Sequence, residues 1–459
     1  MHFVKLAIGN LKTRLADGHK RDEEWLAHFL TFRSGSDFKQ RAATMYSSID
    51  KGFPTGLLDL VLKQAREEGF YVELMDGRTP RPPPDRAQAL RGLMAHQEEA
   101  VEALLGAGAG IAQHATGAGK TRIAQALLAL YRNHHAVMVV PSKGLLKQFA
   151  KSYREQLGRE CGVIGDGQWS PAQHTVATFQ SLYADLQGPR RFDYDSVEIL
   201  LVDEVHGAAS STFWEVAMAF RKTFLRAGFS ATAFDRLDKK GLYVRSALGP
   251  VVHELKPGAA AEAKIIAKPT IVMRPFPQPP LGGSPHVMRT QAIVGNGQRN
   301  LLALQEILRL PKPCLAFVRE IAHGELVHAM ASRHAPSVFV HGELPSAEMA
   351  SRLRAVVEGR VTVMVASPVM NQGIDVPNLA SIVNLAAGMS AIQTLQKIGR
   401  GTRMVRDAEG KILKDSLACV DLADEDCGCK GATHASCAMF NRWTSARRTA
   451  YAKAGYLVL

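Results

Sequence analysis

The eight residues His114–Thr121 read HATGAGKT and follow an apolar run that is typical of a buried strand. A glycine-containing turn between a strand and a helix that opens with Lys-Thr points backbone N–H groups at an anion. We expect Lys120 to reach the outer phosphates of a nucleotide and the Thr121 hydroxyl to bind Mg²⁺. The strict pattern has glycine where this chain has His114, and an incidental glycine turn is the alternative for these eight residues alone. The predicted nucleotide-binding residues of the loop are Thr116, Gly117, Gly119, Lys120 and Thr121.

A second stretch, ILLVDEVH at residues 199–206, is an apolar strand that ends in two carboxylates. Doubly wound sheets place their chemistry at the carboxyl ends of strands. Asp203 is predicted to hold Mg²⁺, and Glu204 to orient and deprotonate the attacking water. Capping of the next helix by one of these acids is the alternative. His206 is predicted to relay between the nucleotide site and neighbouring motifs, and a packing histidine is its alternative.

Phosphoryl transfer also requires positive charge near the γ-phosphate, commonly from an arginine on another domain or subunit. The stretch QTLQKIGRGTR, residues 393–403, supplies Arg400 and Arg403, which lie three apart and share a helical face. A solvated basic face is the alternative for such a pair, but the neighbouring Gln396 and Gly399 favour a catalytic role. We therefore expect the two arginines to complete a split catalytic site.

The charge balance indicates a polyanionic partner. Among 459 residues, 56 Lys and Arg against 43 Asp and Glu give a formal net charge of +13. No uninterrupted apolar run is long enough to span a bilayer, and charges interrupt the apolar patch at the N-terminus. We therefore expect no membrane segment and no signal peptide. The six cysteines do not form a secreted disulfide framework, which favours the cytoplasm.

Two proline-rich stretches, residues 78–86 and 275–285, predict extended connections between folded units. Between and after them, apolar strand patterns alternate with helical patterns. Such alternation is typical of parallel sheets with helices on both faces, so the predicted fold class is α/β with two tandem domains. The expected domains are a small α+β accessory domain at 1–85, a nucleotide-binding domain at 86–275 and a second such domain at 286–459.

The order of the motifs from about residue 90 to residue 451 resembles that of the superfamily 2 helicases. LRGLMAHQEEAV resembles the adenine-reading Q-type motif, VVPSKGLLKQF motif Ia, GFSATAF motif III, VASPVMNQGIDVPNL motif V and QKIGRGTR motif VI. The resemblance implies two RecA-like domains that bind ATP and Mg²⁺ in the cleft between them, with Arg400 and Arg403 as arginine fingers. It also implies adenine recognition by Gln97, nucleotide contacts by Gly373 and Asp375, and coupling of hydrolysis to movement by His206, Ser230, Thr232 and Gln396.

The acid motif reads DEVH rather than DEAD, which favours DNA over RNA, and stretches such as REIAHGELVHAM resemble the phage UvsW and XPB-like group. The resemblance implies an ATP-dependent DNA helicase or translocase that acts on duplex, forked or branched DNA in replication, recombination or repair, as a monomer by default. An RNA helicase, the motor of a restriction or defence system and a binding scaffold without turnover are the alternatives. The expected nucleic-acid contacts are Pro141, Thr178, Arg319 and Ser367.

A cysteine-rich stretch near the end of the chain has the spacing C-x-C-x4-H-x2-C. Three thiolates and one imidazole are a competent tetrahedral set for Zn²⁺, and reduced surface cysteines are the alternative. Cys419, which precedes this set, is expected to lie in the core on a strand. The candidate zinc ligands are Cys427, Cys429, His434 and Cys437.

Overall fold

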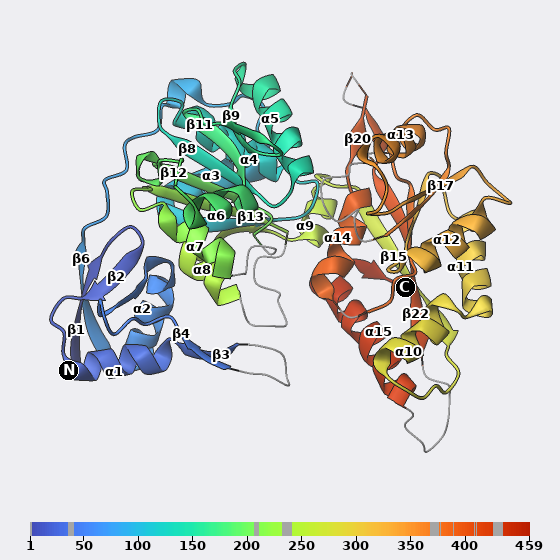
Figure 1. Ribbon diagram of the computed structural model, residues 1–459, viewed down its shortest axis with the longest axis horizontal. Helices are drawn as coiled ribbons and strands as arrows, with labels where there is room; N and C mark the ends of the chain where they lie inside the picture. Colours follow the sequence, from blue (N-terminus) through green and yellow to red (C-terminus); the bar gives the residue numbers. More distant parts are fainter. Residues whose placement is uncertain are drawn as a thin grey trace. The chain divides into compact units, whose positions relative to one another are not determined.

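The computed structural model describes residues 2–34, 41–205, 211–231, 241–367, 376, 378–388, 390–407, 409, 411–425 and 435–459. The chain forms two compact units (Figure 1). The first contains residues Met1–His114 and Gly119–Glu254, and the second contains Ala115–Ala118 and Leu255–Leu459. No helix in the described ranges combines the length and the hydropathy needed to cross a lipid bilayer.

The N-terminal part of the first unit is a small α+β fold whose main sheet has the strand order β5-β2-β1-β6. Alternation along β1 places Val4 and Leu6 in a core with Leu26 of α1 and Val61 of α2. Its elements are β1 (His2–Ile8), β2 (Lys12–Leu15), α1 (Lys20–Phe29), β3 (Thr31–Ser34), β4 (Arg41–Thr44), β5 (Gly52–Pro54), η1 (Thr55–Leu57), α2 (Leu58–Glu67) and β6 (Phe70–Asp76).

This N-terminal part packs closely on helix α8 (Gly241–Leu248) of the same unit. A Cβ atom at Gly56 would lie 2.2 Å from the carbonyl oxygen of Arg245, so only glycine fits there. Arg245 also forms an ion pair with Asp59, and Tyr243 packs against the apolar core of the N-terminal part. The accessory fold and the larger part of the first unit therefore share an interface.

The larger part of the first unit is a predominantly parallel sheet of order β10-β9-β11-β8-β12-β13-β7-β14. One apolar cluster joins one face to α3, α4 and α5, and a second joins the other face to α6, α7 and α8. The strands are β7 (Ala109–His114), β8 (Ala136–Val140), β9 (Gly162–Gly165), β10 (Gln168–Ser170), β11 (His174–Thr178), β12 (Ile199–Asp203), β13 (Leu225–Ser230) and β14 (Val251–Leu255). The helices are α3 (Ala95–Ala107), α4 (Lys120–Leu130), α5 (Lys143–Leu157), α6 (Phe179–Gln187) and α7 (Ser211–Ala219), with α8.

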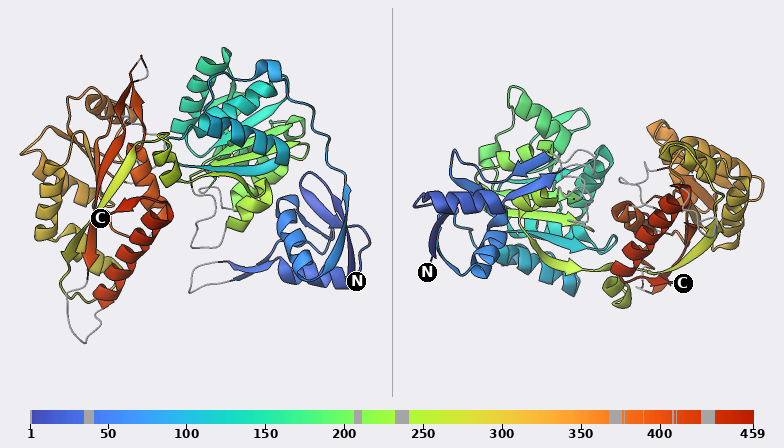
Figure 2. Two further views of the ribbon diagram at one scale, coloured as in Figure 1. Left: turned by 180° about the vertical axis from the view of Figure 1, so that it is seen from behind. Right: turned by 90° about the horizontal axis from the view of Figure 1, so that it is seen from below.

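The second unit repeats this architecture with a parallel sheet of order β17-β18-β16-β19-β22-β15-β23. Helices α11 and α15 lie on opposite sides of this sheet, as the view from below shows (Figure 2). The strands are β15 (Lys268–Pro277), β16 (Cys314–Phe317), β17 (Ser337–Val340), β18 (Val363–Ala366), β19 (Ser381–Asn384), β22 (Ser416–Glu425) and β23 (Leu457–Val458), with a separate ribbon of β20 (Val405–Arg406) and β21 (Ile412–Lys414). The helices are α9 (Pro257–Glu262), α10 (Pro285–Arg289), α11 (Gly297–Arg309), α12 (Ile321–Ala331), α13 (Ser346–Val357), α14 (Ala391–Gly401) and α15 (Ala435–Lys453).

The boundary between the units differs from the position expected from the second proline-rich stretch. The chain passes into the second unit at Leu255, and Pro275–Pro277 are the last residues of strand β15. They pair with Ala423–Glu425 of β22, whereas β23 pairs only with Thr270 and Ile271. The end of β15 therefore has a strand neighbour on one side, and such an edge tolerates proline because one row of N–H groups is not needed.

Three buried histidines carry neutral imidazoles. Burial lowers the pKa of His114 and of His323 to about 3, and the pKa of His174 to about 4. The unfolded chain binds protons at these positions below the ordinary histidine pKa of about 6.5. Stability is therefore fully present above that pH and is lost as pH falls toward the folded values, by about 2 kcal/mol per histidine near pH 5.

We expect His174→Gln to reduce the fall in melting temperature between about pH 7 and about pH 5, because the substitution removes one of these protonation differences. His135→Gln is the matched control, because His135 lies in the same unit and is exposed. Thermal unfolding followed by circular dichroism at both pH values measures the effect. An identical pH dependence in the wild type and in His174→Gln would contradict the assignment.

Candidate ATP site and nucleic-acid contacts

The pairing register of the first sheet brings most of the predicted residues of that unit to one edge. In the adjacent parallel strands β11, β8 and β12, Thr178 pairs with Val140 and Val202 with Val139. On the other side, Asp203 pairs with Phe229, and Ser230 pairs with the residue before His114. The ends of five neighbouring strands therefore place Thr178, Pro141, Asp203, Ser230 and the start of the phosphate loop along one carboxyl edge.

The phosphate loop has the backbone that an anion cradle requires. Gly117 and Gly119 have φ values of 88° and 82°, a region that other residues enter only with strain. Gly119 is the N-cap of α4, so Lys120 and Thr121 form the first turn of that helix, where N–H groups are available to a phosphate. The Lys120 ammonium donates to the carbonyl oxygen of His114 at 3.1 Å.

Gln97 lies directly against this loop. Its side-chain oxygen accepts a hydrogen bond from the Met94 N–H at 3.0 Å, which fixes the amide at the start of α3. A Cβ atom at Gly119 would lie 2.3 Å from Gln97 Nε2, so Gly119 provides both the turn and the space for the glutamine. Within the first unit, the structure thus brings the predicted adenine-reading residue against Gly119, the loop residue that precedes Lys120.

The acid pair has an unusual backbone. Glu204 has a φ of 50°, and its N–H donates to Asp203 Oδ1 at 2.9 Å. A left-handed conformation at a residue other than glycine is strained, and such strain is concentrated at functional sites. Mg²⁺ is commonly held by one or two carboxylates together with substrate phosphates, so Asp203 and Thr121 are chemically suited to an Mg²⁺–nucleotide complex. Within the described ranges, no three His, Cys, Asp or Glu side chains cluster as a metal site.

In the second unit the carboxyl edge carries two of the predicted nucleic-acid contacts. Val318 and Ser367 follow the neighbouring strands β16 and β18, and the Val318 N–H donates to the Ala366 carbonyl at 3.0 Å. Arg319, the next residue, is exposed, whereas Ser367 is buried. The pairing register of β16 and β18 therefore places Arg319 and Ser367 on the same edge of this sheet.

Helix α14 is anchored by a buried lysine and carries the first of the two predicted arginines, so the prediction that the pair shares a helical face is wrong: the helix ends at Gly401, before Arg403. Arg400 lies in the last turn of α14, and Arg403 is exposed just beyond the helix. Lys397, one turn before Arg400, is buried and donates to Asn384 Oδ1 at 2.9 Å. Burial lowers the pKa of Lys397 to about 8, and the nearby Asp421 opposes this shift.

The same lysine begins a buried polar chain. Asn384 donates to Asp421 Oδ2 at 2.9 Å, and Asp421 also accepts from Arg447 Nε at 3.0 Å and from the Tyr451 hydroxyl at 2.6 Å. Arg447 and Tyr451 belong to α15. This series of hydrogen bonds therefore connects α15 through β22 and β19 to α14, the helix that carries Arg400.

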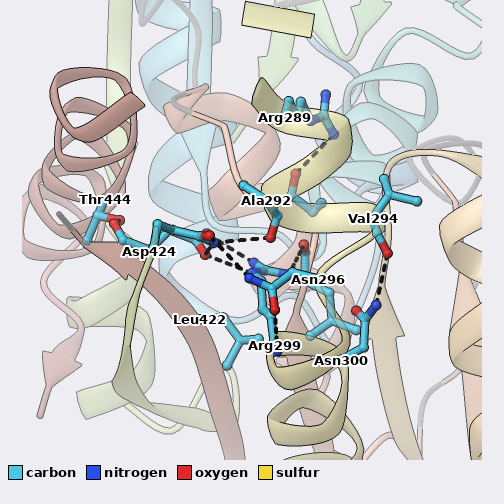
Figure 3. A network of polar contacts seen from close by, with 12 residues as sticks. Arg289, Ala292, Val294, Asn296, Arg299, Asn300, Leu422, Asp424 and Thr444 are labelled. Carbon is cyan, nitrogen blue, oxygen red and sulfur yellow. Dashed lines mark hydrogen bonds and ion pairs between the residues drawn. The ribbon is translucent and has the colours of Figure 1, made fainter. Parts of the chain in front are cut away.

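A second buried ion pair, between Arg299 and Asp424, belongs to the polar network drawn in Figure 3. Asp424 accepts from Arg299 Nε at 2.7 Å and from Arg299 Nη2 at 3.0 Å, and both side chains are at most 1% exposed. Gln278 Nε2 donates to the same carboxylate at 2.7 Å, and the Thr444 hydroxyl donates to the Asp424 carbonyl at 2.8 Å. Figure 3 thus shows α11, β22 and α15 joined at one residue, Asp424, through its carboxylate and its backbone carbonyl.

Several predicted residues lie outside the described residues and stay predictions: His206, Thr232, Gly373, Asp375, Cys427, Cys429 and His434. Gln396 and Cys437 lie in helices whose side chains at those positions are likewise not described. The zinc hypothesis is therefore untested. Cys419 is 1% exposed on β22, which confirms the prediction of a core cysteine.

Sequence reasoning missed three side chains that the structure brings to these sites: Lys397, Asp421 and His253. Lys397 could have been found, because it lies three residues before Arg400 on the same helical face. No sequence signal pointed to His253, which lies on an edge strand and contacts the phosphate loop only in the folded chain.

Both units match models of known protein families. Residues 91–235 match the family model described as "Type III restriction enzyme, res subunit", and residues 300–405 match "Helicase conserved C-terminal domain". A DNA 3'-5' translocase XPB2 of Sulfurisphaera tokodaii is 31% identical over 173 residues, which cover 38% of each chain. A putative DNA 3'-5' helicase Rad25 of Haloarcula marismortui is 25% identical over 69% of this chain and 51% of its own length.

Solved structures agree on the fold. The type ISP restriction-modification enzyme LlaBIII bound to DNA is similar over 86% of this chain and 33% of its own, with a TM-score of 0.59 and 15% identity. Each of the two RecA-like domains carries one of these two family models, which defines a protein with helicase domains. The chain belongs to the superfamily 2 helicases. It spans 38% and 51% of the length of the two curated relatives described above.

Proposed function

We propose that this protein is an ATP-driven DNA translocase or helicase that acts on duplex, forked or branched DNA. The observation that carries the proposal is the meeting of Gln97, Gly119 and Lys120 at one loop, on the sheet edge where Asp203 and Glu204 also end. The names of the two archaeal relatives, a DNA translocase and a DNA helicase, support DNA as the substrate. The net charge of +13 suits a polyanion.

In this proposal each residue has one role. Lys120 contacts the outer phosphates, Thr121 and Asp203 hold Mg²⁺, and Glu204 takes the proton of the attacking water. Arg400 and Arg403 stabilise the charge that develops on the γ-phosphate. When bound, Mg²⁺ would neutralise negative charge on the phosphate oxygens.

The nucleic-acid contacts are assigned to the carboxyl edges of the two sheets. Thr178 is 5% exposed, and its Oγ1 accepts from the Ser181 N–H at 3.4 Å as the N-cap of α6. Thr178 would therefore act on DNA by orienting the N-terminus of α6 toward a phosphate, whereas the exposed Arg319 would contact a phosphate directly. Such contacts carry no sequence information.

We expect DNA binding to weaken steeply with salt, because each neutralised phosphate releases counterions. Arg319→Ala should lower the slope of log K against log salt by about 1 and weaken binding uniformly across sequences. Arg360→Ala is the matched control, because Arg360 is exposed near the opposite end of β18 in the same unit. Fluorescence anisotropy over a salt series measures both slopes. Affinity that is flat with salt would contradict the proposal.

The substrate is tested by ATPase and unwinding assays with single strands, blunt duplexes, forks, four-way junctions and RNA. Forked or branched DNA is expected to stimulate hydrolysis more than duplex RNA does. Stronger stimulation by RNA would instead establish the RNA helicase alternative.

The motor of a restriction system is a second candidate, favoured by the description of the family model over residues 91–235. Such a motor would depend on partner subunits and on a recognition sequence. Stimulation of the isolated chain by DNA of arbitrary sequence supports the first proposal, and a strict sequence requirement supports the second.

A further inference from the structure

The histidine that stands where the strict loop pattern has glycine is anchored by a second histidine. His114 ends β7 with a side chain that is 0% exposed, and His253 lies on the neighbouring edge strand β14. His114 Nε2 and His253 Nδ1 are 2.7 Å apart, and the ring centroids are 4.9 Å apart. A hydrogen bond of this length between two imidazole rings requires one nitrogen to donate and the other to accept.

The contacts of these two histidines extend to α3, the helix that carries Gln97. His253 Nε2 lies 3.4 Å from Glu99 Oε2, and the ring of His96 lies 5.6 Å from the ring of His114. With Nε2–H directed at the Glu99 carboxylate, His253 Nδ1 is the acceptor and His114 Nε2–H is the donor. Burial, together with His253, His96 and Lys120, lowers the pKa of His114 to about 3, so a neutral His114 fits this assignment.

The backbone of His114 contacts the catalytic lysine. The His114 carbonyl oxygen accepts a hydrogen bond from Lys120 Nζ at 3.1 Å. One residue is therefore held through its side chain by His253 and through its carbonyl by Lys120. A change in the His253 contact would turn His114 and displace the atom that the Lys120 ammonium touches.

We propose that His253 is a positioning residue of the ATP site, which acts through His114 to fix the start of the phosphate loop and the place of Lys120. The inference rests on the proposed function, since it assigns Lys120 to a nucleotide phosphate. Glu99 orients the His253 ring and so connects the helix of Gln97 to the same loop. A glycine at position 114 would leave the loop free of this anchor.

The test uses the full chain with two substitutions, one that removes the hydrogen-bond acceptor and one that supplies another acceptor. His253→Phe removes the acceptor for His114, whereas the side-chain oxygen of His253→Asn takes the place of Nδ1. We expect His253→Phe to raise KM for ATP about tenfold with little change in kcat, because a buried donor loses its partner and ground-state and transition-state binding weaken together. His253→Asn should restore most of the loss, and Glu99→Gln should raise KM about twofold.

His174→Phe is the matched control for loss of stability. His174 is 3% exposed in the same sheet and shares a 2.7 Å hydrogen bond with the Tyr153 hydroxyl. The substitution His174→Phe should lower the melting temperature and leave KM for ATP unchanged. The positioning role is overturned if His253→Phe leaves KM unchanged, or if His174→Phe raises KM as much. If His253→Phe does not fold, an unchanged KM in Glu99→Gln overturns it. A wild-type chain that binds no fluorescent ATP analogue overturns the proposed function itself.

Discussion

Lys120→Ala and Glu204→Gln are each expected to reduce DNA-stimulated ATP hydrolysis by about 10²–10³-fold or more. Lys120 begins α4 directly after a glycine with a φ of 82°, where its ammonium can leave the His114 carbonyl for a phosphate. Glu204 directly follows β12 with a strained backbone, and its replacement by glutamine removes the carboxylate that takes the proton. The two variants should differ in one respect, since only Glu204→Gln keeps the cation that binds ATP.

Binding and turnover measured separately distinguish these steps. Lys120→Ala should lose affinity for a fluorescent ATP analogue, and Glu204→Gln should bind it and release no phosphate. Lys151→Ala is the control, because Lys151 is exposed in the same unit and pairs only weakly with Glu155 along α5. Full stimulated turnover in either of the two site variants, with wild-type melting temperature, would reject their catalytic roles.

Arg299→Met is expected to destabilise the second unit by about 3–5 kcal/mol. The substitution removes one member of a fully buried ion pair and leaves the Asp424 carboxylate without the two hydrogen bonds from Arg299, while the Gln278 amide still donates to it. Replacement of both partners, Arg299→Met with Asp424→Leu, should restore much of the stability, because no buried charge is then left without a counterion.

Urea unfolding followed by circular dichroism measures these differences. Arg360→Met is the matched control, because Arg360 and Glu358 form an ion pair on the surface of the same unit. An exposed pair of this kind contributes about 0–1 kcal/mol. Equal destabilisation by Arg299→Met and Arg360→Met would show that burial does not determine the effect.

Much of the fold could be predicted because the pattern of each element is local. The apolar runs before Pro141, Asp203 and Arg319 are strands, and strands alternate with helices as expected. Parallel pairing then brings their carboxyl ends to one edge, so the sequence order of the motifs translates into spatial proximity. The positions of Lys120, Asp203 and Glu204 near this edge were predictable for this reason.

Other features depend on contacts between distant residues. The His114–His253 hydrogen bond joins positions 139 residues apart, and nothing in the residues around His253 indicates it. The buried Lys397 and Asp421 were hidden because a charged residue normally indicates an exposed face. Pro275 and Pro277 suggested a connection, but β15 accepts them at its end, where the described residues provide a strand neighbour on one side.

The central claim, that this chain converts ATP hydrolysis into work on DNA, is tested most directly by steady-state phosphate release from the purified protein. The rate is measured without nucleic acid, with increasing forked DNA and with RNA of the same length. The account predicts a rate that rises with forked DNA to saturation and rises less with RNA. A rate that is unchanged at saturating DNA would contradict it.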